Sequence, residues 1–216
     1  MSILVFVEDW NGAYKKASFE AVAYAKSWAT MNDNSVIAVT DTRAPAGELA
    51  DYGADHIIQN GLGSTAMGIA GQLKELSAEA SGIVIAGTSL GRSLAPGLSA
   101  LTVGALSTNT INLPFGASPL HLKRGAFSSK GIEAIELNGD LPIVSFVPNS
   151  IGLEPVAGEG NVESREVSSY DALEVVSTEV ASGKVALPEA EAVVSAGRGL
   201  KGPENWGMID ELAEVL

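Results

Sequence analysis

A glycine-rich segment near the end of the chain carries the strongest chemical signal. Gly197-Arg-Gly199-Leu-Lys-Gly202 fits the pattern G-x-G-x-x-G and stands between an apolar run, residues 192–196, and an amphipathic stretch. We expect a strand, a tight turn and a helix, because glycines let the backbone approach a phosphate and a helix N-terminus offers free N–H groups. Arg198 would add a fixed positive charge. Since the sequence ends one expected helix later, the segment predicts only the opening unit of a cofactor domain.

A second segment, Gly87-Thr-Ser89-Leu-Gly91, matches the G-x-S-x-G pattern of a nucleophile elbow. A hydrolase of that type needs an acid and then a histidine after the serine. No carboxylate lies between Ser89 and His121, the only later histidine. Small residues at a strand-to-helix turn are explained by geometry alone. We therefore expect a structural turn here, with phosphate binding by the loop 87–93 and Arg92 as the alternative.

The remaining candidate motifs predict no chemistry. Gly61-Leu-Gly63-Ser-Thr-Ala66 resembles a dinucleotide fingerprint, but it does not follow the first strand, so we expect a helix start capped by Ser64 or Thr65. Neither His56 nor His121 has a partner that the sequence identifies. There is no cysteine, no H-E-x-x-H and no Walker A motif. We expect no catalytic residue and no metal site.

The composition limits the class of protein. The 216 residues are 46% hydrophobic, enough for a sizeable core, and the net charge of −13 argues against nucleic acid and anionic membranes. No apolar stretch reaches the roughly 20 residues that cross a bilayer. The chain opens almost directly into an apolar run, so we expect no signal segment and a prokaryotic-type cytoplasmic protein.

The first half of the chain alternates strand-like and helical segments, which is typical of a parallel sheet covered by helices on both faces. We expect strands at 3–7, 35–40, 56–59 and 82–86, and helices at 14–31, 46–52, 66–80 and 90–103. Pro96 should kink or interrupt the last helix.

After Gly104 the pattern becomes β-rich, with runs at 118–127, 131–137 and 143–147. The Asn138-Gly139 pair favours a hairpin between the second and third runs. Residues 152–169 are expected to be a linker. The predicted domains are therefore 1–187, an α/β scaffold, and 188–216, the truncated start of the cofactor domain. This last piece should dock on the first domain, pair with another chain, or be poorly ordered.

One long window lacks acidic residues. No Asp or Glu occurs from Ala80 to Ile132, although the chain has 26 of them, and the window contains five basic or titratable residues: Arg92, His121, Lys123, Arg124 and Lys130. A buried strand–helix unit followed by a β-ribbon explains this pattern. A face for an anionic ligand or a partner protein is compatible with it as well.

These residues together resemble the alpha subunit of electron-transfer flavoprotein. The N-terminal stretch Ile3-LVFVEDWNGAYKKASFEAVAYAK and the unit Ile83-VIAGTSLGRSLAPGLSALTVGALSTNT are similar to that family, and Lys123-Arg124 falls where it carries a β-ribbon with an arginine. The strongest match is Val193-VSAGRGLKGPENW, which is similar to the turn that opens the FAD domain, with Ala196 in place of a glycine. The usual Tyr-Ala-Gly-Asn, Gly-Ala-Ser-Arg and Gln-Val-Gly-Gln-Thr-Gly stretches are absent.

The resemblance implies a fold, a cofactor and partners. The expected fold is α/β: a three-layer parallel sheet of the adenine-nucleotide alpha-hydrolase type with an antiparallel β-ribbon, plus the first βα unit of an incomplete FAD-binding domain. Arg198 maps onto a flavin-binding residue, and Gly197, Gly199 and Lys201 share its loop. FAD would be held in the complete heterodimer with the beta subunit, and weakly or not at all by this chain alone.

The implied role is electron carriage rather than catalysis. The heterodimer takes electrons from flavin dehydrogenases, such as the acyl-CoA dehydrogenases of fatty acid beta-oxidation, and passes them to a downstream acceptor. The alternative is a stand-alone module that binds AMP or ATP with the loop 87–93. It predicts nucleotide binding that is lost on Arg92→Glu.

Overall fold

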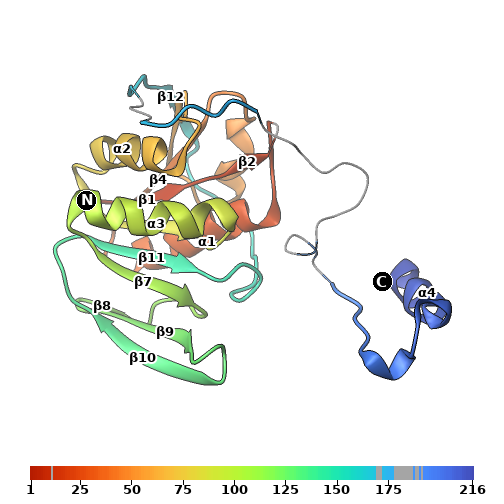
Figure 1. Cartoon of the computed structure of the whole chain (residues 1–216). Helices are drawn as coiled ribbons and strands as arrows, with labels where there is room; N and C mark the ends of the chain where they lie inside the picture. The colour runs from red at the N-terminus through yellow and green to blue at the C-terminus, as the bar shows by residue number, and fades with distance from the viewer. Residues whose placement is uncertain (11, 169–171, 178–186, 188–189, 191) are drawn as a thin grey trace. The chain divides into compact units, whose positions relative to one another are not determined.

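The computed structural model describes residues 1–10, 12–168, 172–177, 187, 190 and 192–216. These residues belong to two compact units, Met1–Val175 and Val176–Leu216, and each is described by itself (Figure 1). The predicted boundary at 187/188 falls beside residues outside the described part, so the division into 1–187 and 188–216 stays a prediction.

The first unit is built on one mixed sheet in the order β10-β9-β7-β11-β6-β1-β4-β5-β12, with β8 paired to β9. Seven strands pair in parallel along most of it: β1 (Ser2–Phe6), β4 (Ser35–Asp41), β5 (His56–Asn60), β6 (Ala80–Ala86), β7 (Ala105–Thr110), β11 (Pro142–Phe146) and β12 (Asn161–Ser164). An antiparallel ribbon extends one edge through β8 (Gly116–Ala117), β9 (Leu120–Ala126) and β10 (Gly131–Leu137).

Helices cover both faces of this sheet (Figure 1). Successive side chains of a strand point to opposite faces, so β1 supplies Ile3 and Val5 to one core and Leu4 and Phe6 to the other. The first core is completed by α1 (Lys16–Thr30) and the short 3-10 helix η1 (Ala46–Tyr52). The second is completed by α2 (Ala66–Leu76) and α3 (Ser89–Thr102). The predicted three-layer α/β architecture with an antiparallel ribbon is confirmed.

The predicted hairpin at Asn138-Gly139 is wrong. β10 pairs with β9, in the register Glu133↔Arg124, and the chain turns between them at residues 127–130. After Asn138 the chain returns to the middle of the sheet, where β11 lies between β6 and β7. An Asn-Gly pair favours a tight turn, but the apolar run 143–147 gains more from burial inside the sheet than at its edge.

Two further predictions need correction, those of a linker at 152–169 and of a break at Pro96. β12 lies inside the predicted linker, and β7 was not predicted. The two-stranded hairpin of β2 (Asp9–Trp10) and β3 (Ala13–Tyr14) was also not expected. The helix α3 continues past Pro96 without interruption. Proline removes one donor and weakens a helix, but Leu94, Ala95 and Leu98 anchor this one in the core.

Residues 192–216, the continuous described part of the second unit, contain three short helical segments: η3 (Arg198–Leu200), η4 (Pro203–Asn205) and α4 (Gly207–Val215). The helix predicted after the glycine-rich turn is therefore present. The strand predicted at 192–196 is not formed, because these residues do not pair with any described strand. A strand needs a neighbour to pair its N–H and C=O groups.

Candidate functional site

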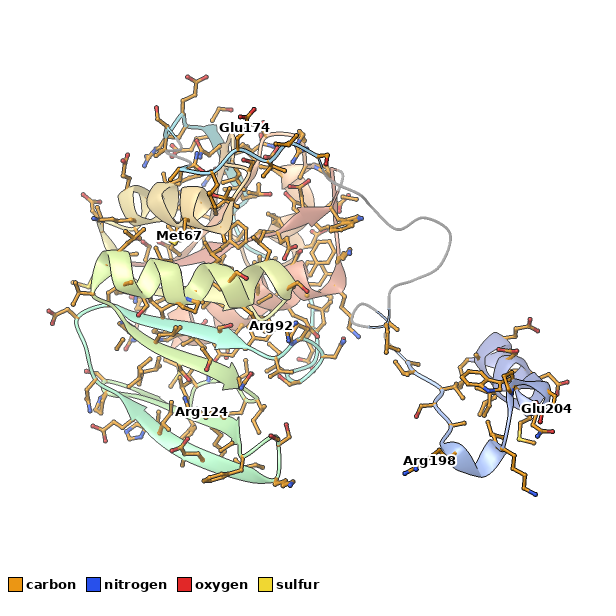
Figure 2. The ribbon with its side chains drawn as sticks, viewed as in Figure 1. Met67, Arg92, Arg124, Glu174, Arg198 and Glu204 are labelled. Carbon is orange, nitrogen blue, oxygen red and sulfur yellow. The ribbon has the colours of Figure 1, made fainter. Side chains whose placement is uncertain are left out.

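The glycine-rich turn brings the four predicted cofactor-binding residues together in the second unit. Gly197 precedes η3 in an extended conformation, and Leu200 N donates to Gly197 O at 3.1 Å. Asn205 Nδ2 donates to Leu200 O at 2.7 Å and fastens the turn to the start of α4. Arg198 is exposed and projects from the unit (Figure 2).

Two of the three glycines of this turn are not required by the packing of the described residues, whereas a Cβ added to Gly202 would collide with the Glu204 carboxylate. A Cβ added to Gly197 or Gly199 would meet no atom within 4 Å, and neither residue has a positive φ. Lys201, by contrast, has a φ of 67°, a backbone conformation that residues other than glycine rarely adopt. Glycines that the packing does not require, next to a lysine with a strained backbone, are typical of a turn that a bound group approaches closely.

A shallow hollow of about 530 Å³ lies beside the turn. It is lined by Gly199, Leu200, Lys201, Glu204, Asn205, Gly207 and Met208. The predicted residues Gly199 and Lys201 thus share this hollow, whereas Gly197 and Arg198 are not among its lining residues. The turn as a whole carries two cations: Lys201 lines the hollow, and Arg198 is exposed two residues before Leu200. These two positive charges fit an anionic group. The carboxylate of Glu204, which lies against Gly202, limits where that group can sit.

The loop 87–93 is a structural turn. Thr88 caps α3, with its Oγ1 accepting from Gly91 N at 3.0 Å and donating to Glu8 Oε2 at 2.5 Å. A Cβ on Gly91 would collide with the carbonyl oxygen of Ala86, and one on Gly87 would lie 2.7 Å from Phe146 O. The glycines therefore serve close backbone packing.

This geometry also bears on the alternative of nucleotide binding. The carboxylate of Glu8 stands at the N-terminus of α3, where a phosphate would have to bind. Repulsion between two anions makes that helix end unsuitable for AMP or ATP. Sequence reasoning missed Glu8, because its partner is 80 residues away in the chain.

The other sequence candidates have structural roles. Thr65 caps α2 by accepting from Gly68 N at 3.0 Å, so the predicted helix start is confirmed. His121 lies in β9 and packs on Phe115 with ring centroids 5.6 Å apart. Within the described residues, no group of three or more His, Cys, Asp or Glu could hold a metal ion.

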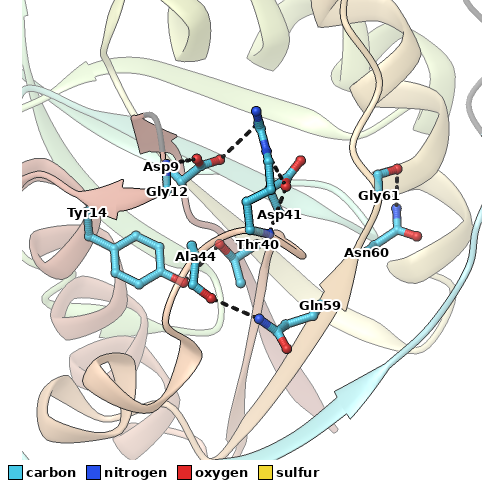
Figure 3. Close-up of polar contacts among 10 residues, drawn as sticks. Asp9, Gly12, Tyr14, Thr40, Asp41, Ala44, Gln59, Asn60 and Gly61 are labelled. Atoms are coloured by element: carbon cyan, nitrogen blue, oxygen red, sulfur yellow. Dashed lines mark hydrogen bonds and ion pairs between the residues drawn. The ribbon is translucent and has the colours of Figure 1, made fainter.

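A polar cluster that was not predicted occupies the carboxyl ends of β1, β4 and β5 (Figure 3). Arg43 Nε donates to Asp41 Oδ1 at 2.8 Å, and its Nη2 lies 3.8 Å from Asp9 Oδ1. Partial burial alone would raise the pKa of Asp41, but the bonds from Arg43 lower it below its usual value. Arg43 thus lies between two carboxylates, one in the β2–β3 hairpin and one at the end of β4, and links the hairpin to the sheet.

The ribbon at the other side of the unit exposes a different surface, here called the hairpin face: β9, β10 and the turn 127–130. Phe127 and Ile132 are 86% and 70% exposed. The turn residues Phe127, Ser128 and Ser129 all have positive φ. Arg124 pairs with Glu133 at 2.8 Å, beside a hollow of about 530 Å³ that Phe127 and Val147 also line. Figure 2 shows where Arg124 lies on this ribbon.

No described helix is long and apolar enough to cross a membrane.

Comparison with known proteins gives a consistent family. The profile of the electron transfer flavoprotein domain matches residues 3–173. The electron transfer flavoprotein subunit alpha of Mycobacterium tuberculosis (strain ATCC 25618 / H37Rv) is 32% identical over 229 residues, covering 99% of this chain and 70% of the relative. That of Syntrophomonas wolfei subsp. wolfei is 27% identical over 224 residues, with 98% and 70% covered. The lactate dehydrogenase (NAD(+),ferredoxin) subunit LctC of Acetobacterium woodii is 27% identical over 233 residues, with 99% and 55% covered.

Proposed function

Given that the chain belongs to the electron transfer flavoprotein family, we propose that its glycine-rich turn holds FAD within a complex and that its first unit is the platform for a beta subunit. The chain is an electron-carrier subunit similar to the alpha subunits of that family. The observation that carries the cofactor proposal is the turn 197–202, where two glycines have no packing role and a cation is exposed beside them.

The roles of the residues follow from their chemistry. Arg198 would bind an anionic or electron-rich part of the cofactor through its fork of N–H donors, and Lys201 would add a second positive charge. Gly197 and Gly199 would let the cofactor approach the backbone. The flavin supplies the redox chemistry when bound, and the protein sets its orientation and surroundings. Flavin dehydrogenases as donors and a cytoplasmic location are part of this proposal.

The test of the cofactor site is the substitution Arg198→Ala. Loss of a charge-assisted contact costs about 1.5–3 kcal/mol, so FAD should bind roughly 10 to 100 times more weakly to the heterodimer. Titration of flavin fluorescence measures this affinity. The matched control is Arg165→Ala, which removes an exposed arginine of the first unit that pairs with Glu163 at 3.0 Å. Equal affinities for the two variants would contradict the role of Arg198.

The partner surface that we propose is the hairpin face. β10 pairs only with β9 among the described strands, which leaves a seven-residue edge open. Native proteins cover or block such edges, and exposed large apolar side chains mark contacts with other proteins. The exposed Lys123 and Lys130 make this region less acidic than the chain as a whole, whose net charge is −13. A beta subunit that presents an apolar surface with acidic residues fits this face.

The double substitution Phe127→Ser with Ile132→Ser tests this surface. Central apolar contacts are worth about 1–2 kcal/mol each, so affinity for the beta subunit should fall by at least tenfold. Isothermal titration of the two purified subunits measures it. Val162→Ser is the matched control, because Val162 is half exposed on β12 at the opposite edge of the sheet. The surface is misassigned if the control weakens association as much as the double variant does.

A further inference from the structure

The segment that joins β10 to β11 has no role in the proposed function. It contains Asn138 and Gly139, which do not form a hairpin turn, and Asn138 is exposed. Asn138 Nδ2 donates to Glu136 Oε1 at 3.1 Å, and its side chain makes no other hydrogen bond within the described structure. The nearest backbone pairings lie on either side of the segment: Leu137 pairs with Leu120 in the β9–β10 ladder, and Ala105 N donates to Leu141 O at 3.0 Å.

An asparagine followed by glycine has a specific reactivity. The main-chain nitrogen of the glycine can attack the side-chain carbonyl carbon of the asparagine, because glycine has no Cβ to obstruct the approach. Gly139 N donates no hydrogen bond to any acceptor among the described residues, so no contact holds it away from Asn138. Since residues 138–140 make no backbone hydrogen bond with any other described residue, the main chain can adopt the geometry that ring closure needs.

The chain contains its own protected counterpart. Asn60 also precedes a glycine, but it is fully buried at the end of β5. Its Oδ1 accepts from Val167 N at 2.8 Å and its Nδ2 points to Gly61 O at 3.4 Å. Both ends of this amide are held, and the strand fixes its backbone. Ring closure at Asn60 requires local unfolding.

We propose that Asn138 is a site of spontaneous deamidation. A bond forms between Gly139 N and Asn138 Cγ, the Cγ–Nδ2 bond breaks, and the amide leaves as ammonia with the proton of Gly139 N. Water then opens the resulting succinimide at either carbonyl. The products are aspartate and isoaspartate, with no oxidant or reductant involved.

The modification changes the charge and the backbone of an exposed segment that lies next to the start of β7. The new carboxylate lies between Glu136 and Asp140, so it replaces a hydrogen bond by repulsion. Isoaspartate also lengthens the main chain by one atom next to Gly139. This residue has little room, because a Cβ on it would lie 2.8 Å from the Cβ of Ala105. The start of β7 is therefore disturbed.

The test is an ageing experiment on the intact chain, and it needs neither FAD nor a partner. The protein is kept folded at mildly alkaline pH, and samples are digested with trypsin and analysed by mass spectrometry. Asn138 and Asn60 fall in different peptides, those of residues 131–165 and 44–74. Asn138 should convert at least about tenfold faster than Asn60, because a protected position reacts only from opened states.

Two controls separate structure from sequence. In concentrated urea the two sites should react at similar rates, since each is an Asn-Gly pair. The variant Asn138→Gln, whose longer side chain closes a ring far more slowly, should keep its 131–165 peptide unmodified at this position. The proposal is overturned if folded Asn138 reacts no faster than folded Asn60. It is also overturned if the glutamine variant shows the same time course at this position.

Discussion

Two tyrosines carry the same hydroxyl group into different surroundings. Tyr24 of α1 is fully buried and stacks on Phe146 with 5.3 Å between ring centroids, and its hydroxyl has no hydrogen-bond partner among the described residues. Tyr14 is only half buried, and its hydroxyl lies 3.0 Å from Thr40 Oγ1. A buried polar group without a partner costs free energy, whereas a bonded one contributes to stability.

Removing each hydroxyl should therefore have opposite effects. Tyr24→Phe should raise the free energy of unfolding by about 1 kcal/mol, and Tyr14→Phe should lower it by about 0.5–1.5 kcal/mol. Urea denaturation followed by circular dichroism measures both. A destabilised Tyr24→Phe would show that the hydroxyl has a partner in solution.

Tyr24 should also make the stability of the fold depend on pH in the alkaline range. Burial raises the pKa of Tyr24 far above its ordinary value. A group whose pKa is raised in the folded state stabilises the fold below the unfolded pKa, about 10, and this contribution is lost as the pH rises further. The midpoint temperature of thermal unfolding should decrease as the pH is raised from about 10 to about 11, and the decrease should be smaller for Tyr24→Phe than for the wild type. Identical slopes for the two proteins would contradict the assignment.

At the scale of elements, one buried glutamine holds the returning chain against the sheet. Gln72 of α2 accepts from Gly63 N at 2.9 Å and donates to Gly61 O at 2.8 Å and to Val167 O at 2.7 Å. The segment after β11 thereby becomes an ordered continuation of the sheet through β12. The sequence predicted a linker at residues 152–169, because Gly, Glu and Ser are frequent there.

Gln72→Ala should release this segment. Three bonds of a fully buried side chain are lost, so destabilisation of about 2–3 kcal/mol is expected. Hydrogen exchange of the amides of residues 161–167 should accelerate more than that of β1 or β6. Gln59→Ala serves as the control, because the Gln59 side chain makes one hydrogen bond within the described structure, to Ala44 O at 2.9 Å. Uniform acceleration across the whole sheet would contradict a local clamp.

The whole molecule carries a large negative charge, which opposes compactness. With a net charge of −13, self-repulsion should be reduced when salt shortens the Debye length from about 30 Å at 0.01 M to 8 Å at 0.15 M. We expect the thermal midpoint of the chain to rise by about 2–5 °C over this range. Differential scanning calorimetry tests it, with sucrose of equal osmolality as the control. A midpoint that falls with salt would mean that attractive ion pairs, such as Arg43–Asp41, outweigh the repulsion.

Local features of the sequence determined much of this protein. Apolar runs of strand length alternate with helical segments, and these fixed the α/β class and most element positions, because buried parallel strands and amphipathic helices have different periodicities. Caps and turns were equally local: Thr65 begins α2, and Gly53, with a φ of 109°, ends η1. The turn 197–202 and the family resemblance also came from contiguous residues.

Tertiary structure decided what depends on distant residues. In the sheet β10 pairs with β9, and β11 lies between β6 and β7. The Asn138-Gly139 pair had instead favoured a hairpin of β10 with β11. Glu8 reaches Thr88 across 80 positions, and Val167 binds Asn60 across 107. Strand pairing and buried hydrogen bonds are selected by the burial and polar satisfaction of the whole core, and no short stretch of sequence contains that information.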